Sequence, residues 1–182
     1  MILLQFNVVN IDSTQHYAEL ALRLARKEKY FIGQIRALNL IAIYYSYKNK
    51  LDSSILSNIQ ALALSTKHDI KKHRSSVYND LAIDLGSLGD HEKSLEYYYK
   101  ALKNIDEGDK FKIYTILNIA GAHECLGHEE HAKYFYEQAS QLAEQTKDRQ
   151  VFHFSLKEKG FYYQREKQLD SALIYFNRAH KV

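Results

Sequence analysis

The chain has 182 residues, of which 46% are hydrophobic and 26% are charged, so it has enough apolar side chains to form a core. A net charge of +3, from 25 basic and 22 acidic residues, is too balanced to favour nucleic acid or an anionic membrane as the main partner. The single cysteine, Cys125, excludes an internal disulfide. No apolar run in the sequence reaches the roughly 18 residues that a membrane-spanning helix needs.

One short pattern recurs five times along the chain. Its clearest copy runs from Ser94 to Ala101, with small residues seven positions apart and Tyr98 between them. The five copies start at Thr14, Ser54, Ser94, Ala132 and Ala172. The steps between them are therefore 40, 40, 38 and 40 residues. Self-similarity at a period of this size predicts stacked helical repeats, which offer an extended binding surface rather than a catalytic pocket.

Each copy of the pattern is predicted to lie on the second helix of a pair, with an amphipathic first helix upstream of it. The absence of proline and the presence of only 7 glycines are typical of long helices joined by short turns. Gly89, Gly127 and Asn49 are expected to end first helices, because they accept the left-handed conformation. We expect nine helices, at residues 12–28, 31–48, 51–66, 70–88, 91–104, 109–126, 129–146, 149–166 and 169–181.

Acidic residues stand two positions before each copy of the pattern. Carboxylates at a helix start can cap free backbone N–H groups and favour the positive end of the helix dipole. A structural role of this kind accounts for all five, so none is interpreted as a catalytic acid. The five residues are Asp12, Asp52, Glu92, Glu130 and Asp170.

The order of apolar, small and aromatic residues in the two central copies resembles the tetratricopeptide repeat. In one copy these residues are Leu81, Ala82, Leu85, Gly89, Ser94, Tyr98 and Ala101. In the next copy they are Ile119, Ala120, Gly127, Ala132, Tyr136 and Ala139. The resemblance extends over nearly the whole chain, with residues 1–30 as a partial first repeat.

The resemblance implies an all-α fold, a right-handed α-solenoid of stacked antiparallel helix pairs with about nine helices, in one domain over residues 1–182. The period of 38–40 residues is longer than the usual length of about 34. Long-period repeats of this kind resemble those of bacterial regulatory proteins.

The resemblance also assigns ligand contact to the concave face, which the first helix of each pair lines. Asn39, Asn79 and Asn118 recur there in three successive repeats, and a side-chain amide can both donate to and accept from the backbone of an extended peptide. The alternative is that these amides bond to neighbouring helices or to water. By register, the candidate binding residues are Arg36, Asn39, Ile43, Tyr47, Asn79, Ile83, Tyr114, Asn118, Glu124, Lys157, Phe161 and Arg165.

A second cluster contains His123, Cys125, His128 and His131, which are ligand types that suit zinc. Their spacing fits no metal-binding motif, because His123 and His128 are five residues apart and the turn at Gly127 divides the cluster. His123 is expected to be buried and Cys125 to act as a small apolar residue. We therefore predict no metal and no cofactor.

The sequence thus predicts a non-enzymatic module that binds a protein or peptide, as the sensory or interaction part of a bacterial signalling or transcriptional regulator. No glycine-rich phosphate loop or Ser-His-Asp order indicates an enzyme, and direct nucleic-acid binding is not expected. The alternative is a structural scaffold that oligomerises through uncapped solenoid ends and positions an attached output domain. Met1 to Leu4 is too short for a signal peptide, which favours the cytoplasm; the periplasm is the alternative for a fragment of a membrane-anchored sensor.

Overall fold

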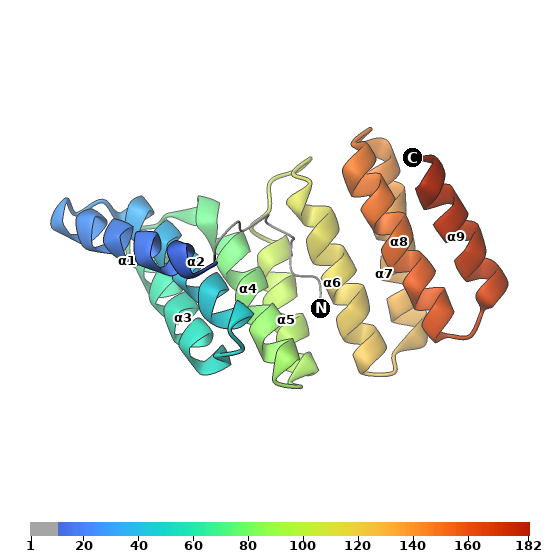
Figure 1. Ribbon diagram of the computed structural model, residues 1–182, viewed down its shortest axis with the longest axis horizontal. Helices are drawn as coiled ribbons and strands as arrows, with labels where there is room; N and C mark the ends of the chain where they lie inside the picture. The colour runs from blue at the N-terminus through green and yellow to red at the C-terminus, as the bar shows by residue number, and fades with distance from the viewer. Residues whose placement is uncertain (1–10) are drawn as a thin grey trace. The chain divides into compact units, whose positions relative to one another are not determined.

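The computed structural model describes residues 11–182, which form nine α-helices and one short 3₁₀ helix (Figure 1). No strand occurs in this part of the chain, and the predicted all-α fold is confirmed. The helix ends lie within a few residues of the predicted ones, except that the 3₁₀ helix η1 (Lys71–His73) replaces the expected first turn of α4. The α-helices are α1 (Ile11–Lys27), α2 (Phe31–Tyr47), α3 (Leu51–Lys67), α4 (Arg74–Ser87), α5 (His91–Leu102), α6 (Phe111–Cys125), α7 (Glu129–Gln145), α8 (Arg149–Arg165) and α9 (Leu169–Lys181).

The chain divides into two compact units, Met1–Ile105 and Asp106–Val182. In the first unit each of the helices α1 to α5 packs on the next one, and in the second unit α6 to α9 do the same (Figure 1). Alternate helices also meet within a unit, α2 with α4 and α6 with α8. The helices are therefore stacked in antiparallel pairs, as the solenoid prediction requires, whereas a single domain over the whole chain stays a prediction.

Small residues bring the two helices of a pair close together at one level. The Ser94 hydroxyl of α5 donates to the Ala82 carbonyl of α4 at 2.7 Å. The Ser54 hydroxyl of α3 lies 2.9 Å from the Ala42 carbonyl of α2. These serines are almost completely buried, because only a short side chain fits between backbones that approach so closely.

Four residues further on, the second helices α3, α5, α7 and α9 have a larger side chain, whereas α1 has Ala18. These side chains are Asn58, Tyr98, Tyr136 and Phe176. Gly160 of α8 leaves room for the last of them, since a Cβ atom at this position would come within 2.6 Å of the Phe176 ring. At this contact the large side chain on one helix of the pair thus fits only because the other helix has a small residue opposite it.

Left-handed residues end the helices, and Gly89, Gly127 and Asn49 take this conformation as predicted, with φ of +87°, +70° and +56°. Four further residues at turns also have the left-handed conformation, which the sequence did not predict. They are Lys29, Asp69, Lys147 and Lys167. The backbone supplies the compensating bond at most of these turns. After Lys29, for example, the next N–H donates to the carbonyl five residues earlier at 2.8 Å.

The predicted caps of the second helices are wrong in position. The acidic residues lie inside the first turn of their helices, where their charge favours the dipole: Asp52, Glu92, Glu130 and Asp170. The capping positions belong to the residues two places earlier: Lys50, Asp90, His128 and Gln168. Of these four, only Asp90 caps with its side chain, which accepts a bond from the Lys93 N–H at 3.2 Å. The side chain of Asp12 lies outside the described part.

Lys159 of α8 is a buried charge that the sequence pattern did not indicate. Its side chain is only 2% exposed. Its ammonium group donates to the Glu137 carboxylate of α7 and lies 4.2 Å from the centroid of the Tyr175 ring of α9. The bond from Lys159 lowers the pKa of Glu137. The buried charge is therefore compensated, and it ties α8 to both of its neighbours.

We expect Gly160→Ala to destabilise the protein by about 1–3 kcal/mol, because the new methyl group overlaps the Phe176 ring. Gly121→Ala is the matched control within α6. A Cβ atom there would meet only the Tyr136 hydroxyl, at 3.9 Å, so helix propensity should stabilise this variant by up to about 1 kcal/mol. Urea unfolding followed by circular dichroism measures both changes, and two effects of the same sign and size would contradict the packing described.

Candidate functional site

The predicted binding residues lie on the first helices of the pairs, and we call the side on which they lie the A-helix face of each unit. On α2 and α4 of the first unit these residues are Arg36, Asn39, Ile43, Tyr47, Asn79 and Ile83. On α6 and α8 of the second unit they are Tyr114, Asn118, Glu124, Lys157, Phe161 and Arg165.

In the first unit, Arg36 and Tyr47 are exposed, whereas Ile43 and Ile83 are half-buried. The Asn39 amide of α2 donates to Oδ2 of Asp80 in α4 at 2.6 Å, which ties the two first helices together. Asn79 is only 3% exposed, and its side chain is also bonded to Asp80. Two of the three amides that could hold a peptide backbone thus bond within the protein.

The third amide occupies a different register. Asn118 stands two residues before Ala120, whereas Asn39 and Asn79 stand three residues before Ala42 and Ala82. The counterparts of Asn118 in the other first helices are Leu40, Asp80 and Glu158. The three amides therefore do not form one straight column, and their role in holding a peptide stays a prediction.

Asp80 is a residue of the A-helix face that sequence reasoning missed. Burial raises its pKa to about 7, the bond from Asn39 opposes this shift, and the charge of Asp84 adds to it. No ion pair joins Asp80 to another side chain within residues 11–182. The signal that could have found it is its register, which it shares with Asn118.

In the second unit, the A-helix face has an aromatic pair at one end and an ion pair at the other. The rings of Tyr114 and Phe154 lie 5.4 Å apart. The Arg165 guanidinium of α8 donates to both carboxylate oxygens of Glu124 in α6, with Nη2 and Oε2 2.8 Å apart. The buried Tyr136 hydroxyl of α7 donates to the same carboxylate at 3.0 Å. The structure thus brings together two predicted residues whose charges neutralise each other.

This network raises the pKa values of two of its members, Tyr136 and Arg165. Burial raises the pKa of Tyr136, and the Glu124 charge raises it further. The bond to Glu124 raises the pKa of Arg165. Both groups therefore keep their protons, and the network is a fixed structural tie rather than an acid–base site.

Between these two ends lie Asn118, Lys157 and Phe161. The Lys157 ammonium lies 5.9 Å from the centroid of the Phe161 ring, and this ring is 37% exposed. Nothing in the described part of the chain forms an ion pair with Lys157. Tyr114 and Glu124 are ten residue steps apart, which corresponds to about 15 Å of helix. An extended segment of about four residues, at about 3.3 Å each, has this length.

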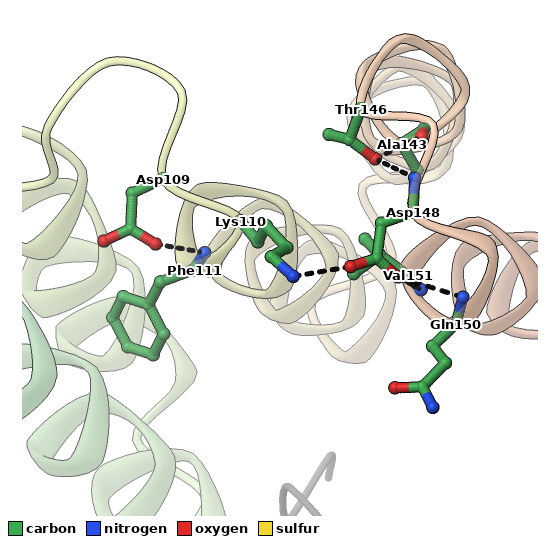
Figure 2. Close-up of polar contacts among 8 residues, drawn as sticks. All are labelled: Asp109, Lys110, Phe111, Ala143, Thr146, Asp148, Gln150 and Val151. Atoms are coloured by element: carbon green, nitrogen blue, oxygen red, sulfur yellow. Dashed lines mark hydrogen bonds and ion pairs between the residues drawn. The ribbon is translucent and has the colours of Figure 1, made fainter.

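The starts of α6 and α8 are held side by side in this unit. Figure 2 shows Asp148 accepting from the Gln150 and Val151 N–H groups, at 3.0 and 3.2 Å, while its other oxygen accepts from the Lys110 ammonium at 2.5 Å. Its own N–H donates to the Thr146 hydroxyl at 3.2 Å. The bond from Lys110 is the main reason that the pKa of Asp148 is lowered. One carboxylate therefore caps α8 and anchors the beginning of α6.

The histidine cluster lies at the turn between α6 and α7. Nδ1 of the buried His123 lies 3.3 Å from Nδ1 of His128, and its ring stacks on those of His131 and Phe135. Cys125 is exposed, contrary to its expected role as a small apolar residue. In the part of the chain that the structure describes, no three potential ligands are placed to hold a metal ion. Burial lowers the pKa of His123, and the nearby histidines lower it further.

Residues 73–145 match the family model described as Tetratricopeptide repeat. The curated proteins contain no match to the sequence. Solved structures do match. BtubC (BKLC) from P. vanneervenii is 17% identical, with a TM-score of 0.70 over 94% of this chain and 88% of its own. A Rap protein complexed with Competence and Sporulation Factor is 19% identical, with a TM-score of 0.72 over 92% of this chain and 53% of its own.

A third similar structure is that of a putative kinesin light chain with nearly identical TPR-like repeats, from Podosopora anserina. It is 14% identical, with a TM-score of 0.66 over 94% of this chain and 93% of its own. This chain thus spans about half the length of the Rap protein but most of the other two. At such identities the likeness concerns the fold alone. None of the helices within residues 11–182 is both long and apolar enough to cross a membrane.

We expect His123 to contribute a loss of stability as the pH is lowered from 7 to 5, measured as the difference between the wild type and a variant without this histidine. Its pKa in the folded protein lies below the ordinary 6.5, so the unfolded chain binds more protons in this range and unfolding becomes easier. His123→Gln should remove most of this loss. His180→Gln, which changes an exposed histidine of α9, is the matched control and should keep it. Urea midpoints at three pH values test the prediction, and equal pH dependence in all three proteins would contradict it.

Proposed function

We propose that this chain, in which residues 73–145 match the tetratricopeptide repeat model, is a non-enzymatic module of that family that binds an extended protein or peptide segment on its A-helix faces. The observation that carries the proposal is the second unit's A-helix face. There, Phe161 exposes a large ring, and Lys157 forms no ion pair with any residue from 11 to 182, between two fixed ends. Exposed aromatic and cationic side chains on a rigid helical face are what a binding surface requires.

The fixed ends limit where a ligand makes its contacts. Glu124 and Arg165 neutralise each other, so neither offers an uncompensated charge to a ligand. Among the predicted residues of this unit that the structure describes, half-buried Lys157 offers a cation without an ion pair, and the Phe161 ring beside it offers apolar surface. A segment with an acidic residue next to an apolar one has the complementary chemistry. The ligand class that fits is therefore an acidic and apolar extended segment.

The finer part of the proposal is that this module is the sensory or interaction part of a bacterial signalling or transcriptional regulator. The similarity to a Rap protein complexed with Competence and Sporulation Factor supports it, as does the long repeat period. A regulator of this kind would work in the cytoplasm. Because the likeness to Rap concerns the fold, the ligand has to be tested on this chain itself.

To test the binding face, peptides selected from a random phage-displayed library against the wild-type protein would be measured by fluorescence anisotropy. Phe161→Ala should raise the Kd at least tenfold, because it removes the exposed ring at the centre of the face. Tyr134→Ala is the matched control, since Tyr134 is an even more exposed aromatic residue, at 55%, but lies on the second helix α7. An equal loss in both variants, or no loss in Phe161→Ala, would refute the proposed face.

The second candidate function is a scaffold that self-associates. The observation that favours it is the exposed apolar surface of α9, formed by Leu169, Leu173 and Ile174. Side chains of this kind on consecutive turns of one helix are typical of a contact surface.

If α9 mediates self-association, sedimentation equilibrium should show a mass that rises with protein concentration. Leu173→Glu should then shift the protein to the monomer, because a charge cannot be buried there without a partner. Leu56→Glu on α3 is the control, since Leu56 is similarly exposed but lies in the other unit. A wild-type protein that stays monomeric at every concentration would rule out the scaffold function.

A further inference from the structure

Two acidic residues lie one turn apart on α4 and face α2 and α3. Asp84 is 1% exposed, and Asp80 is half-buried. Asp84 contacts three polar side chains: the Ser54 hydroxyl at 2.6 Å, the Asn58 amide at 3.5 Å and the Ser46 hydroxyl. Neither acid forms an ion pair with any side chain of the described residues. A buried carboxylate without a cation is strongly unfavourable, so its protonation state needs an explanation.

The number of protons on the Ser54 hydroxyl provides an explanation of this protonation state. The Ser54 hydroxyl has a single proton but lies near two acceptors, the Ala42 carbonyl at 2.9 Å and Asp84 Oδ2 at 2.6 Å. In the following helix pair, the equivalent Ser94 donates its proton to the Ala82 carbonyl at 2.7 Å. If Ser54 does the same, its oxygen is an acceptor towards Asp84. The short contact then requires a proton on the Asp84 carboxyl group.

The surroundings of Asp84 fit a neutral acid. Asn58 is completely buried, its amide nitrogen makes only a long contact to Asp84, and its carbonyl oxygen has no partner. An ionised carboxylate draws short bonds from every donor in reach. A protonated Asp84 can donate to Ser54 and accept from the Ser46 hydroxyl, which leaves no buried charge.

We propose that Asp80 and Asp84 form a proton-binding pair, which holds a proton while α4 packs against α2 and α3 and which weakens this packing when the proton is lost at higher pH. Asp84 is the site of the proton, and Asp80 is coupled to it from one turn away. Deprotonation places two like charges on one helix face, and neither forms an ion pair with a side chain of the described residues. The contacts to Ser54 and Asn39 are the ones that this change affects.

The direction of the pH effect follows from the pKa shifts. Burial raises the pKa of Asp84 above the ordinary 3.8 and raises that of Asp80 to about 7. The folded protein therefore binds more protons than the unfolded chain from about pH 4 to about pH 7. Its stability from this pair is complete below that range and is lost as the pH rises through it.

Other titratable groups lie on the elements that pack against α4, and none of them bonds to either acid. Histidines are among them, so the wild-type protein alone does not isolate the pair. The groups include Arg36, Tyr44, Tyr45 and Tyr47 on α2, Asp52 and Lys67 on α3, Lys71 and His73 in η1, Arg74 and Tyr78 on α4, and His91, Glu92, Lys93, Glu96, Tyr97, Tyr98, Tyr99 and Lys100 on α5.

The double variant Asp80→Asn/Asp84→Asn isolates the pair, because each amide has nearly the shape of the acid that it replaces and stays neutral at every pH. The folding equilibrium constant, measured by urea unfolding at pH 5.5 and pH 8.5, should fall at least roughly tenfold more in the wild type than in the variant. The contributions of the histidines cancel in this comparison. Asp52→Asn, which changes an exposed acid of α3, is the control and should behave as the wild type.

A second readout does not depend on the stability of a variant. The infrared spectrum of the wild type at pH 6 should contain the carbonyl band of a protonated carboxylic acid, which disappears at alkaline pH. If the double variant does not fold, Asp80→Asn alone should still weaken the pH dependence of stability. A wild-type spectrum without the acid band at pH 6, or equal pH dependence in the wild type and both variants, would overturn the proposal.

Discussion

The close approach of paired helices at a small residue is the constraint on which the rest of this structure depends. Ser54 and Ser94 meet the carbonyl groups of the preceding helices, so the distance within a pair is set by a single side chain. Once this distance is set, the residue four positions further on must fit the remaining space. Phe176 does so only because Gly160 faces it. The repeat pattern therefore reflects how the helices pack and not the chemistry of a site.

The same packing decides which side chains of the first helices are available for binding. Alternate helices lie side by side within a unit, and side chains about one repeat apart join them. Asn39 bonds to Asp80 in the first unit, and Glu124 bonds to Arg165 in the second. Because these polar groups already bond to each other, they are not available to bond to a ligand. What remains exposed is mainly aromatic and cationic, and the proposed function depends on that remainder.

Buried charge is handled in two different ways in the two units. Lys159 is compensated by the Glu137 carboxylate and an aromatic ring, so its charge persists inside the protein. Asp84 has hydroxyl and amide neighbours and forms no ion pair within residues 11–182, which favours the neutral acid. A counter-ion makes a buried charge insensitive to pH near neutrality, whereas a proton makes it sensitive. Of these two buried groups, Asp84 is thus the one whose packing we connect to pH.

The sequence by itself determined the helices, their pairing and the small residues at their contacts, because these depend on periodicities within about 40 residues of chain. It also placed Phe161 on the exposed side of its helix. Only the tertiary structure decided that Glu124 meets Arg165 and that Lys159 is buried. The physical reason is that such contacts join different helices, so they depend on side-chain directions that exist only after the repeats have stacked. A pattern of residue types records which face a side chain occupies, but not which partner it finds there.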